Sequence, residues 1–200
     1  MEVQELRPGL WRWTGSHPEW NHAEHWGPEV GSVYAELPDA VVVVDPLVPD
    51  DSEEQFWTAL DRDVERLGLP VHVLLTVHWH ERSVATVLDR YKATLWRPEE
   101  KGELPTGVHA EIVKGGDWVE ALFFLEPQRA LVAGDLLIGK NGGVELPVSW
   151  FPKGEQEWAE RELRPELRER LEKLPVELVI VSHGEPVLAN GADALRRALS

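Results

Sequence analysis

The sequence predicts an α+β fold in one domain spanning residues 1–200. Three observations support this prediction. The chain has 200 residues, of which 42% are hydrophobic, and this is enough to form one core. Short runs of β-forming residues bounded by Gly and Pro recur in two stretches of the chain. Segments whose apolar residues have helical spacing follow each of these stretches, so strands and then helix occur twice over.

In the first stretch, β-branched and aromatic residues predict strands, and Pro38-Asp39 predicts the turn between two of them. Asp51, Ser52 and two glutamates have the residue types that open a helix, and Gly68 can end it. A buried strand and a short helix are expected next. The expected order is strands at 6–14, 30–37 and 41–44, a helix ending at Leu67, a strand at 71–77 and a helix at 83–91.

The second stretch contains four more apolar segments, which we expect to form a second sheet, with a hairpin turn at 125–129. The last third is rich in Glu and Arg at helical spacing, which is typical of a solvated helix face. The expected elements are strands at 93–96, 107–113, 119–125 and 130–133, a helix at 155–173, a strand at 178–181 and a helix at 192–199.

Composition excludes several classes of function. The formal net charge of −16, with dispersed basic residues, argues against a nucleic-acid partner, because phosphate binding needs clustered Lys and Arg. The chain has no cysteine, so any metal site must use His and carboxylate ligands. Neither a membrane span nor a secretory signal is evident, so we expect a cytoplasmic protein without a membrane partner.

Metal-competent side chains follow three of the apolar runs. His78 and His80 come after residues 71–77, Asp135 comes after 130–133, and His183 follows the late strand. In an extended segment, residues two apart point the same way, so His78 and His80 could face one cation. Each motif alone also has an ordinary reading as a surface histidine, a turn or a loop. Their order and spacing together favour a site.

With this order, the chain resembles the metallo-β-lactamase superfamily. The resemblance implies a four-layer αββα sandwich in which His78, His80, Asp135 and His183 match metal ligands. It also implies that Asp135 is the catalytic, metal-bridging aspartate and that Asp45 braces the histidine loop. The sequence departs from the family pattern where Arg82 replaces an aspartate ligand and Ser83 a histidine. Residues 114–117 also lack the expected histidine, so three ligands are missing.

The missing ligands predict an impaired site with at most one Zn²⁺, and the alternative is no metal at all. A mononuclear zinc site needs about three protein ligands and one open position for water. His17, His22 and His25 lie in a segment rich in Trp and could supply a substitute ligand or a lid. The ordinary alternative is that the tryptophans pack this loop while the histidines face water. Arg82 is expected to pair with one or both of the carboxylates of Asp135 and Asp45, or else to turn outward and contact neither.

Two functions therefore stand as hypotheses. The first is a metal-dependent hydrolase of small esters, thioesters or similar small molecules. The second is a non-catalytic protein of the same fold that binds a small ligand or a partner in an aromatic-lined cleft. The sequence contains 10 Trp residues, which could line such a cleft or serve as ordinary core. Neither the substrate nor the oligomeric state follows from the sequence.

Overall fold

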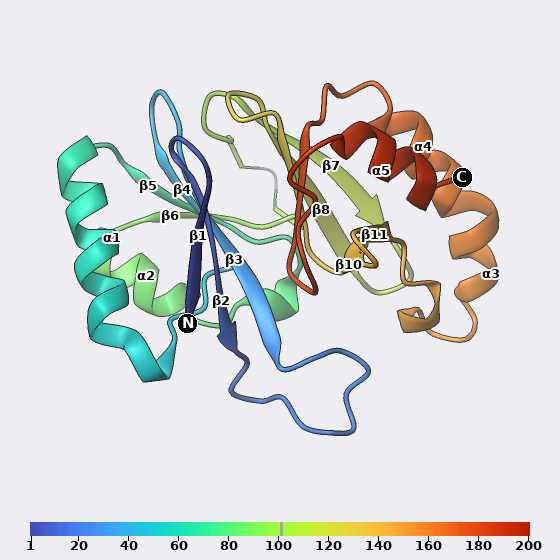
Figure 1. Cartoon of the computed structure of the whole chain (residues 1–200), viewed down its shortest axis with the longest axis horizontal. Helices are drawn as coiled ribbons and strands as arrows, with labels where there is room; N and C mark the ends of the chain where they lie inside the picture. Colours follow the sequence, from blue (N-terminus) through green and yellow to red (C-terminus); the bar gives the residue numbers. More distant parts are fainter. Residues whose placement is uncertain (101) are drawn as a thin grey trace. The chain divides into compact units, whose positions relative to one another are not determined.

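The structure is a computed structural model that describes residues 1–100 and 102–200. The chain divides into two compact units, Met1–Val108 and His109–Ser200. Each unit consists of a sheet with its own helices, and each is described by itself below (Figure 1). The prediction of a single domain over residues 1–200 stays a prediction.

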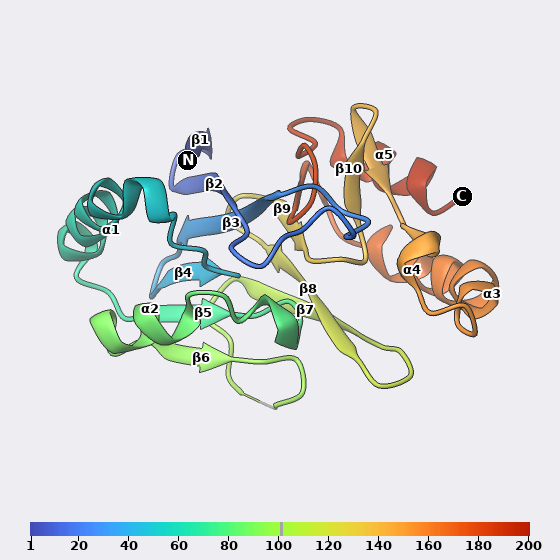
Figure 2. The same ribbon diagram turned by 90° about the horizontal axis from the view of Figure 1, so that it is seen from below.

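The first unit is built on a six-stranded sheet whose spatial order follows the sequence, from β1 to β6 (Figure 2). Strands β1 to β4 pair antiparallel, whereas β4, β5 and β6 run parallel. The strands are β1 (Glu2–Arg7), β2 (Leu10–Ser16), β3 (Glu29–Glu36), β4 (Val41–Val44), β5 (Val71–Leu74) and β6 (Thr94–Trp96).

Two sequence predictions in this unit are wrong. The single strand expected at residues 6–14 is a hairpin, because Pro8 and Gly9 make a turn between β1 and β2. Gly9 has a φ of 75°, which glycine adopts readily and other residues rarely do. The strand β6 was expected in the second sheet, but it pairs with β5 in the first one.

Two helices, α1 (Glu53–Leu67) and α2 (Val84–Tyr91), pack on one face of this sheet. Phe56 and Leu60 of α1 and Val87 of α2 meet alternate residues of the parallel strands in one apolar cluster. Gly68 ends α1 as predicted: its φ is 62° and its N–H bonds to the carbonyl of Val64. The helix spacing and the cap therefore agree with the sequence.

The second unit contains a four-stranded sheet in the order β12, β9, β8, β7 and a separate two-stranded hairpin, β10 and β11. Asn141 and Gly142 join the hairpin with φ values of 53° and 73°, the left-handed pair that a tight hairpin turn needs. This Asn-Gly pair is a hairpin signal that the sequence predictions did not include. The strands are β7 (Val108–Lys114), β8 (Val119–Leu125), β9 (Ala130–Ala133), β10 (Ile138–Lys140), β11 (Gly143–Glu145) and β12 (Leu178–Val181).

The helices of the second unit pack their apolar residues into a cluster that includes Leu163, Leu167 and Leu195. The one helix expected at 155–173 is in fact α3 (Gln156–Trp158), a π-helical turn (Ala159–Leu163) and α4 (Arg164–Leu171). Pro165 lies in the first turn of α4, and its ring and missing N–H disfavour an unbroken α-helix through this point. The last helix, α5 (Gly191–Ala198), is close to the prediction.

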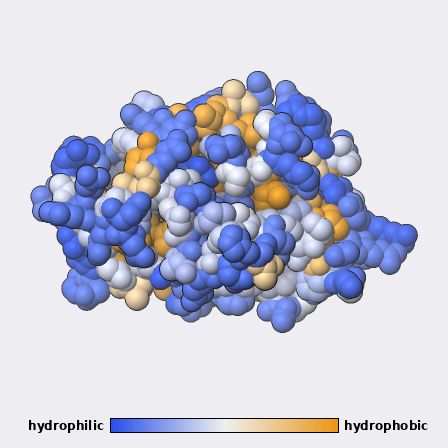
Figure 3. Space-filling model, turned by 60° about the horizontal axis from the view of Figure 1, so that its bottom comes forward, coloured by the Kyte–Doolittle hydropathy of each residue, from blue (hydrophilic) through white to orange (hydrophobic). Residues whose placement is uncertain are grey.

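The surface is mainly hydrophilic on the face that Figure 3 shows, and hydrophobic residues gather there only in small groups. Within residues 1–100 and 102–200, no helix combines the length and the apolar character needed to cross a membrane. The cytoplasmic location stays a prediction.

Candidate metal centre

The two histidines after β5 do not share a direction. The segment His78–His80 is one turn of 3₁₀ helix rather than the extended chain expected from the sequence. With about three residues per turn, side chains two apart point roughly 120° away from each other. His80 is buried, whereas the side chain of His78 is 54% exposed and its Nδ1 lies 3.8 Å from Glu99. The expected alignment of the pair is therefore wrong.

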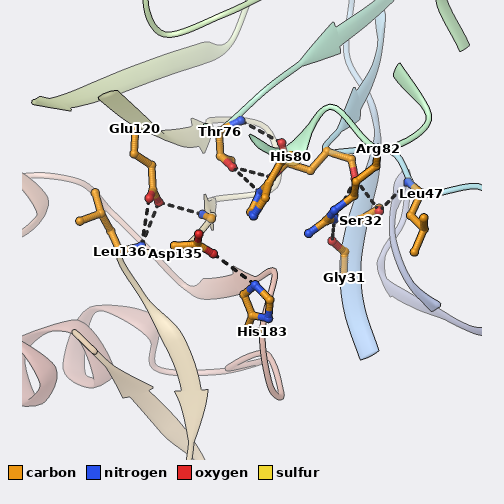
Figure 4. Close-up of polar contacts among 12 residues, drawn as sticks. Gly31, Ser32, Leu47, Thr76, His80, Arg82, Glu120, Asp135, Leu136 and His183 are labelled. Carbon is orange, nitrogen blue, oxygen red and sulfur yellow. Dashed lines mark hydrogen bonds and ion pairs between the residues drawn. The ribbon is translucent and has the colours of Figure 1, made fainter. Parts of the chain in front are cut away.

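His80 is held by a buried carboxylate at the end of β4. Asp45 Oδ2 lies 2.8 Å from His80 Nδ1, and the same carboxylate accepts bonds from Thr76 N at 2.9 Å and Thr76 Oγ1 at 2.5 Å. Figure 4 shows Thr76 beside the ring of His80. A proton on Nδ1 that is donated to the carboxylate leaves Nε2 with a lone pair. This is the arrangement that orients a metal-binding histidine.

Thr76 was not singled out from the sequence, although it is the one polar residue within the apolar run 71–77 besides His72. It is fully buried, and its hydroxyl also lies 3.0 Å from His80 Nδ1. A buried hydroxyl needs a hydrogen-bond partner, so the position of Thr76 within a predicted buried strand was the available signal.

Arg82 contacts the backbone at Asp45 and at a neighbouring strand. Its Nη1 donates to the backbone carbonyls of Gly31 at 3.0 Å and Asp45 at 3.2 Å (Figure 4). The side chain is partly buried, so the alternative of an outward-turned arginine is wrong. The next residue, Ser83, accepts a bond from Val48 N at 2.9 Å, which ties it to the segment that follows β4. Pairing of Arg82 with the two carboxylates stays a prediction.

We expect Arg82→Ala to lower the free energy of unfolding by about 1.5 to 3 kcal/mol, the range for hydrogen bonds made by a charged group. The measurement is urea unfolding of the purified protein. Arg62→Ala is the control, because the Arg62 side chain is 72% exposed and pairs with its neighbour Asp63 at the surface. An Arg82→Ala protein as stable as the control would show that the two carbonyl contacts contribute nothing.

The second unit brings Asp135 and His183 together. Strands β9 and β12 are parallel neighbours, with Ala133 opposite Val181, so the residues that follow them leave the sheet at the same edge. His183 Nε2 lies 3.2 Å from Asp135 Oδ1 (Figure 4). The His183 ring also meets Trp150 edge-on at a centroid distance of 5.2 Å. The parallel register therefore explains why two residues far apart in sequence meet.

A close backbone approach fixes the turn after His183. Gly184 has a φ of 82°, and a Cβ added there would lie 2.3 Å from the carbonyl oxygen of Gly139. The N–H of Gly139 in turn donates to the carbonyl of His183 at 2.8 Å. Only glycine fits at position 184, so the Ser-His-Gly sequence is set by packing as well as by chemistry.

Glu120 anchors the loop that carries Asp135. It lies within β8, is only 2% exposed, and accepts bonds from Gly134 N at 3.1 Å and Leu136 N at 3.0 Å. These two amides flank Asp135 in the chain (Figure 4). Glu120 is not among the residues predicted from the sequence, although an acid inside the apolar run 119–125 was a usable signal, because a buried carboxylate needs donors.

The two ligand atoms of the second unit, Asp135 Oδ1 and His183 Nε2, have a spacing that fits a zinc ion. Two ligands of a tetrahedral zinc site, each about 2.0 to 2.1 Å from the metal, lie about 3.3 Å apart. The observed 3.2 Å between Asp135 Oδ1 and His183 Nε2 agrees with that edge. Imidazole nitrogen and carboxylate oxygen are also ordinary zinc ligands.

The histidines proposed as substitutes lie in the long loop between β2 and β3. His22 and His25 are exposed, and His17 is half-buried against the ring of Trp26. Trp20 Nε1 donates to the carbonyl of Trp26 at 2.8 Å, so the tryptophans hold this loop together. This arrangement agrees with the ordinary reading for His22 and His25.

Comparison with known proteins gives a result only at the level of structure. No family model matches the chain, and no curated protein matches it in sequence. Solved structures match along nearly its whole length. The structure of VMB-1 has a TM-score of 0.62 at 14% identity, covering 99% of this chain and 94% of that one. The DIM-1 metallo-β-lactamase exposed to ceftazidime has a TM-score of 0.58 at 10% identity, covering 99% and 95%.

This chain has the metallo-β-lactamase fold. A third match is the metallo-β-lactamase FIM-1 from Pseudomonas aeruginosa in its mono-zinc form, with a TM-score of 0.55 at 16% identity over 99% of this chain and 96% of that one. The predicted fold class, an α+β sandwich of the metallo-β-lactamase type, is confirmed by these matches. At such identities the similarity concerns the fold, and the chemistry must be argued from the residues.

Proposed function

We propose that this metallo-β-lactamase-fold protein is a metal-dependent hydrolase of small molecules with a single metal ion, for which Asp135 and His183 are ligands and His80 is the further ligand that the family resemblance implies. The observation that carries the proposal is the 3.2 Å spacing of Asp135 Oδ1 and His183 Nε2, which suits a shared zinc ion. The braced tautomer of His80 supports it, because its Nε2 is prepared as a ligand.

A bound zinc ion would supply Lewis acidity and lower the pKa of a water molecule toward neutrality. The residues of the chain have separate parts in this proposal. Asp45 would keep the proton of His80 on Nδ1, so that Nε2 has a lone pair available for a metal ion. Asp135 is the proposed catalytic residue: its Oδ2 would accept a proton from the attacking water and return it to the alcohol or thiol that leaves when the acyl C–O or C–S bond breaks. Small esters and thioesters are the proposed substrates, since their carbonyl carbon is open to attack by water.

A single ion, rather than two, follows from the residues that are present. Arg82 places a permanent positive charge where a second ion would need a carboxylate, and Ser83 Oγ is already bonded to Val48 N. The segment 114–117 offers no histidine. The FIM-1 structure in its mono-zinc form supports a one-ion site on this fold.

We expect calorimetric titration with Zn²⁺ to give one ion per chain. His80→Ala should weaken zinc binding by at least about 10-fold, because one of roughly three ligands is lost. His78→Ala is the matched control, an exposed histidine two residues away, and should bind zinc like the parent protein. Two ions per chain would contradict the one-ion site and direct attention to His17, His22 and His25 as substitute ligands.

A second candidate function is a non-catalytic protein that binds a small ligand or a partner and has lost metal chemistry. The replacement of three expected ligands, with Arg82 among the replacements, favours this candidate. The same titration decides between the two. A parent protein that takes up no zinc, even after dialysis against zinc, would contradict the hydrolase proposal and support the non-catalytic binding protein.

A further inference from the structure

The first unit contains a pocket of about 380 Å³, and His80 is not one of the residues that line it. Its walls come from the start of the β2–β3 loop, the segment after β4 and the 3₁₀ turn after β5. The volume lies within the range of small-molecule sites, at about 300 to 1,000 Å³. The lining residues that determine its chemistry are His17, Glu19, Asp50, Trp79, Glu81 and Arg82.

Trp79 gives the pocket an aromatic wall. Trp79 is 47% exposed, whereas most large apolar residues of this protein are buried. Trp79 belongs to the same 3₁₀ turn as the exposed His78, whose ring it meets edge-on at 4.6 Å. Aromatic rings attract cations through their quadrupole, and tryptophan does so more strongly than the other aromatic residues.

The charges of the pocket favour a cation as well. Glu81 is paired with Arg97 at 2.6 Å, so it adds no net charge. The guanidinium of Arg82, whose Nη1 donates to two backbone carbonyls, contributes one positive charge against the two negative charges of Glu19 and Asp50. Glu19 and Asp50 form no ion pair with any residue in the described part of the chain. Two carboxylates without a cationic partner therefore border the same space as an exposed indole.

We propose that this pocket binds a small organic cation, such as a quaternary or primary ammonium group. The ammonium would lie on the face of Trp79, and Glu19 and Asp50 would supply opposite charge. The apolar side chains of Leu47 and Val48, which also line the pocket, would contact the carbon substituents. The proposal does not depend on zinc or on hydrolysis, because none of the proposed metal ligands takes part in it.

The test is calorimetric titration of the full chain with choline and with its neutral carbon isostere, in which a tert-butyl group replaces the trimethylammonium. Choline should bind at least about 10-fold more tightly than the isostere, because only the cation gains from the indole and the carboxylates. Trp79→Leu should weaken choline binding by roughly 10- to 30-fold. Equal affinity for the two compounds, or no choline binding, would overturn the proposal.

A matched pair of double variants separates the pocket from the overall charge of −16. Glu19→Gln with Asp50→Asn removes two pocket carboxylates, and Glu24→Gln with Asp51→Asn removes two exposed carboxylates outside the lining. We expect the first pair to weaken choline binding by about 5-fold or more and the second by less than about 2-fold. Equal losses would show that choline responds only to net charge. All four residues are exposed, so thermal unfolding should confirm intact protein in both variants.

Discussion

Asp45→Ala is expected to lower the free energy of unfolding by roughly 3 to 5 kcal/mol, because three buried donors lose their acceptor at once. These donors are Thr76 N, Thr76 Oγ1 and, in the proposed tautomer, His80 Nδ1. Asp45 also has a φ of 47°, a backbone conformation that alanine tolerates less well than aspartate or asparagine. Urea unfolding monitored by tryptophan fluorescence measures the loss.

Asp45→Asn separates the stability of the fold from the orientation of His80. The amide keeps one accepting oxygen and the backbone conformation, so we expect a smaller loss of about 1 to 3 kcal/mol. A neutral amide no longer holds the proton of His80 on Nδ1 as the charged carboxylate does. We therefore expect zinc affinity to fall by about 10- to 100-fold. Asp89→Asn is the control, since that side chain is 87% exposed. A stable Asp45→Asn protein with unchanged zinc affinity would show that Asp45 has no part in zinc binding.

Glu120→Ala is the second change with a large expected effect, a loss of roughly 2 to 4 kcal/mol in the free energy of unfolding. The substitution leaves the amides of Gly134 and Leu136 without their acceptor inside the protein. The loop between these amides carries Asp135, so its carboxylate should become less well placed. We therefore also expect a fall of about 10-fold or more in zinc affinity.

Glu120→Gln tests positioning with less damage, because one amide oxygen can still accept from the loop. Glu126→Gln is the matched control in the same unit, since its side chain is 65% exposed. If the two Gln variants bind zinc equally well while Glu120→Ala merely melts earlier, Glu120 has a role in stability alone. If the parent protein binds no zinc, the hydrolase proposal fails, and the stability prediction for Glu120 is unaffected.

Much of the fold could be predicted from local signals. Helix α1 ends at Gly68 because glycine takes the left-handed cap, and β8 spans residues 119–125 as the apolar run indicated. Errors arose where a short turn interrupts a run, as at Pro8-Gly9, or where pairing partners decide the sheet, as for β6. Periodicity predicts that a strand exists, but it does not indicate which strand lies beside it.

The site was less predictable for a different reason. The pattern of His78 and His80 requires an extended chain, and the chain turns into a 3₁₀ helix directly after Val77. A polar residue in an apolar run, such as Thr76 or Glu120, gives no sign of its partner before the fold is known. Asp45 was expected near the histidines only through the resemblance, and the structure records its bond to His80.

The strictly sequential order of the first sheet affects how the protein can assemble during synthesis. Each new strand from β2 to β6 finds its neighbour already made, so the sheet can grow as the chain leaves the ribosome. Strands β5 and β6 pair in parallel with their neighbours, so each follows a crossover connection that contains a helix. These two strands can therefore pair only after α1 and α2 have been synthesised. Protease protection of chains arrested at successive lengths should therefore rise in steps, with delays before β5 and β6.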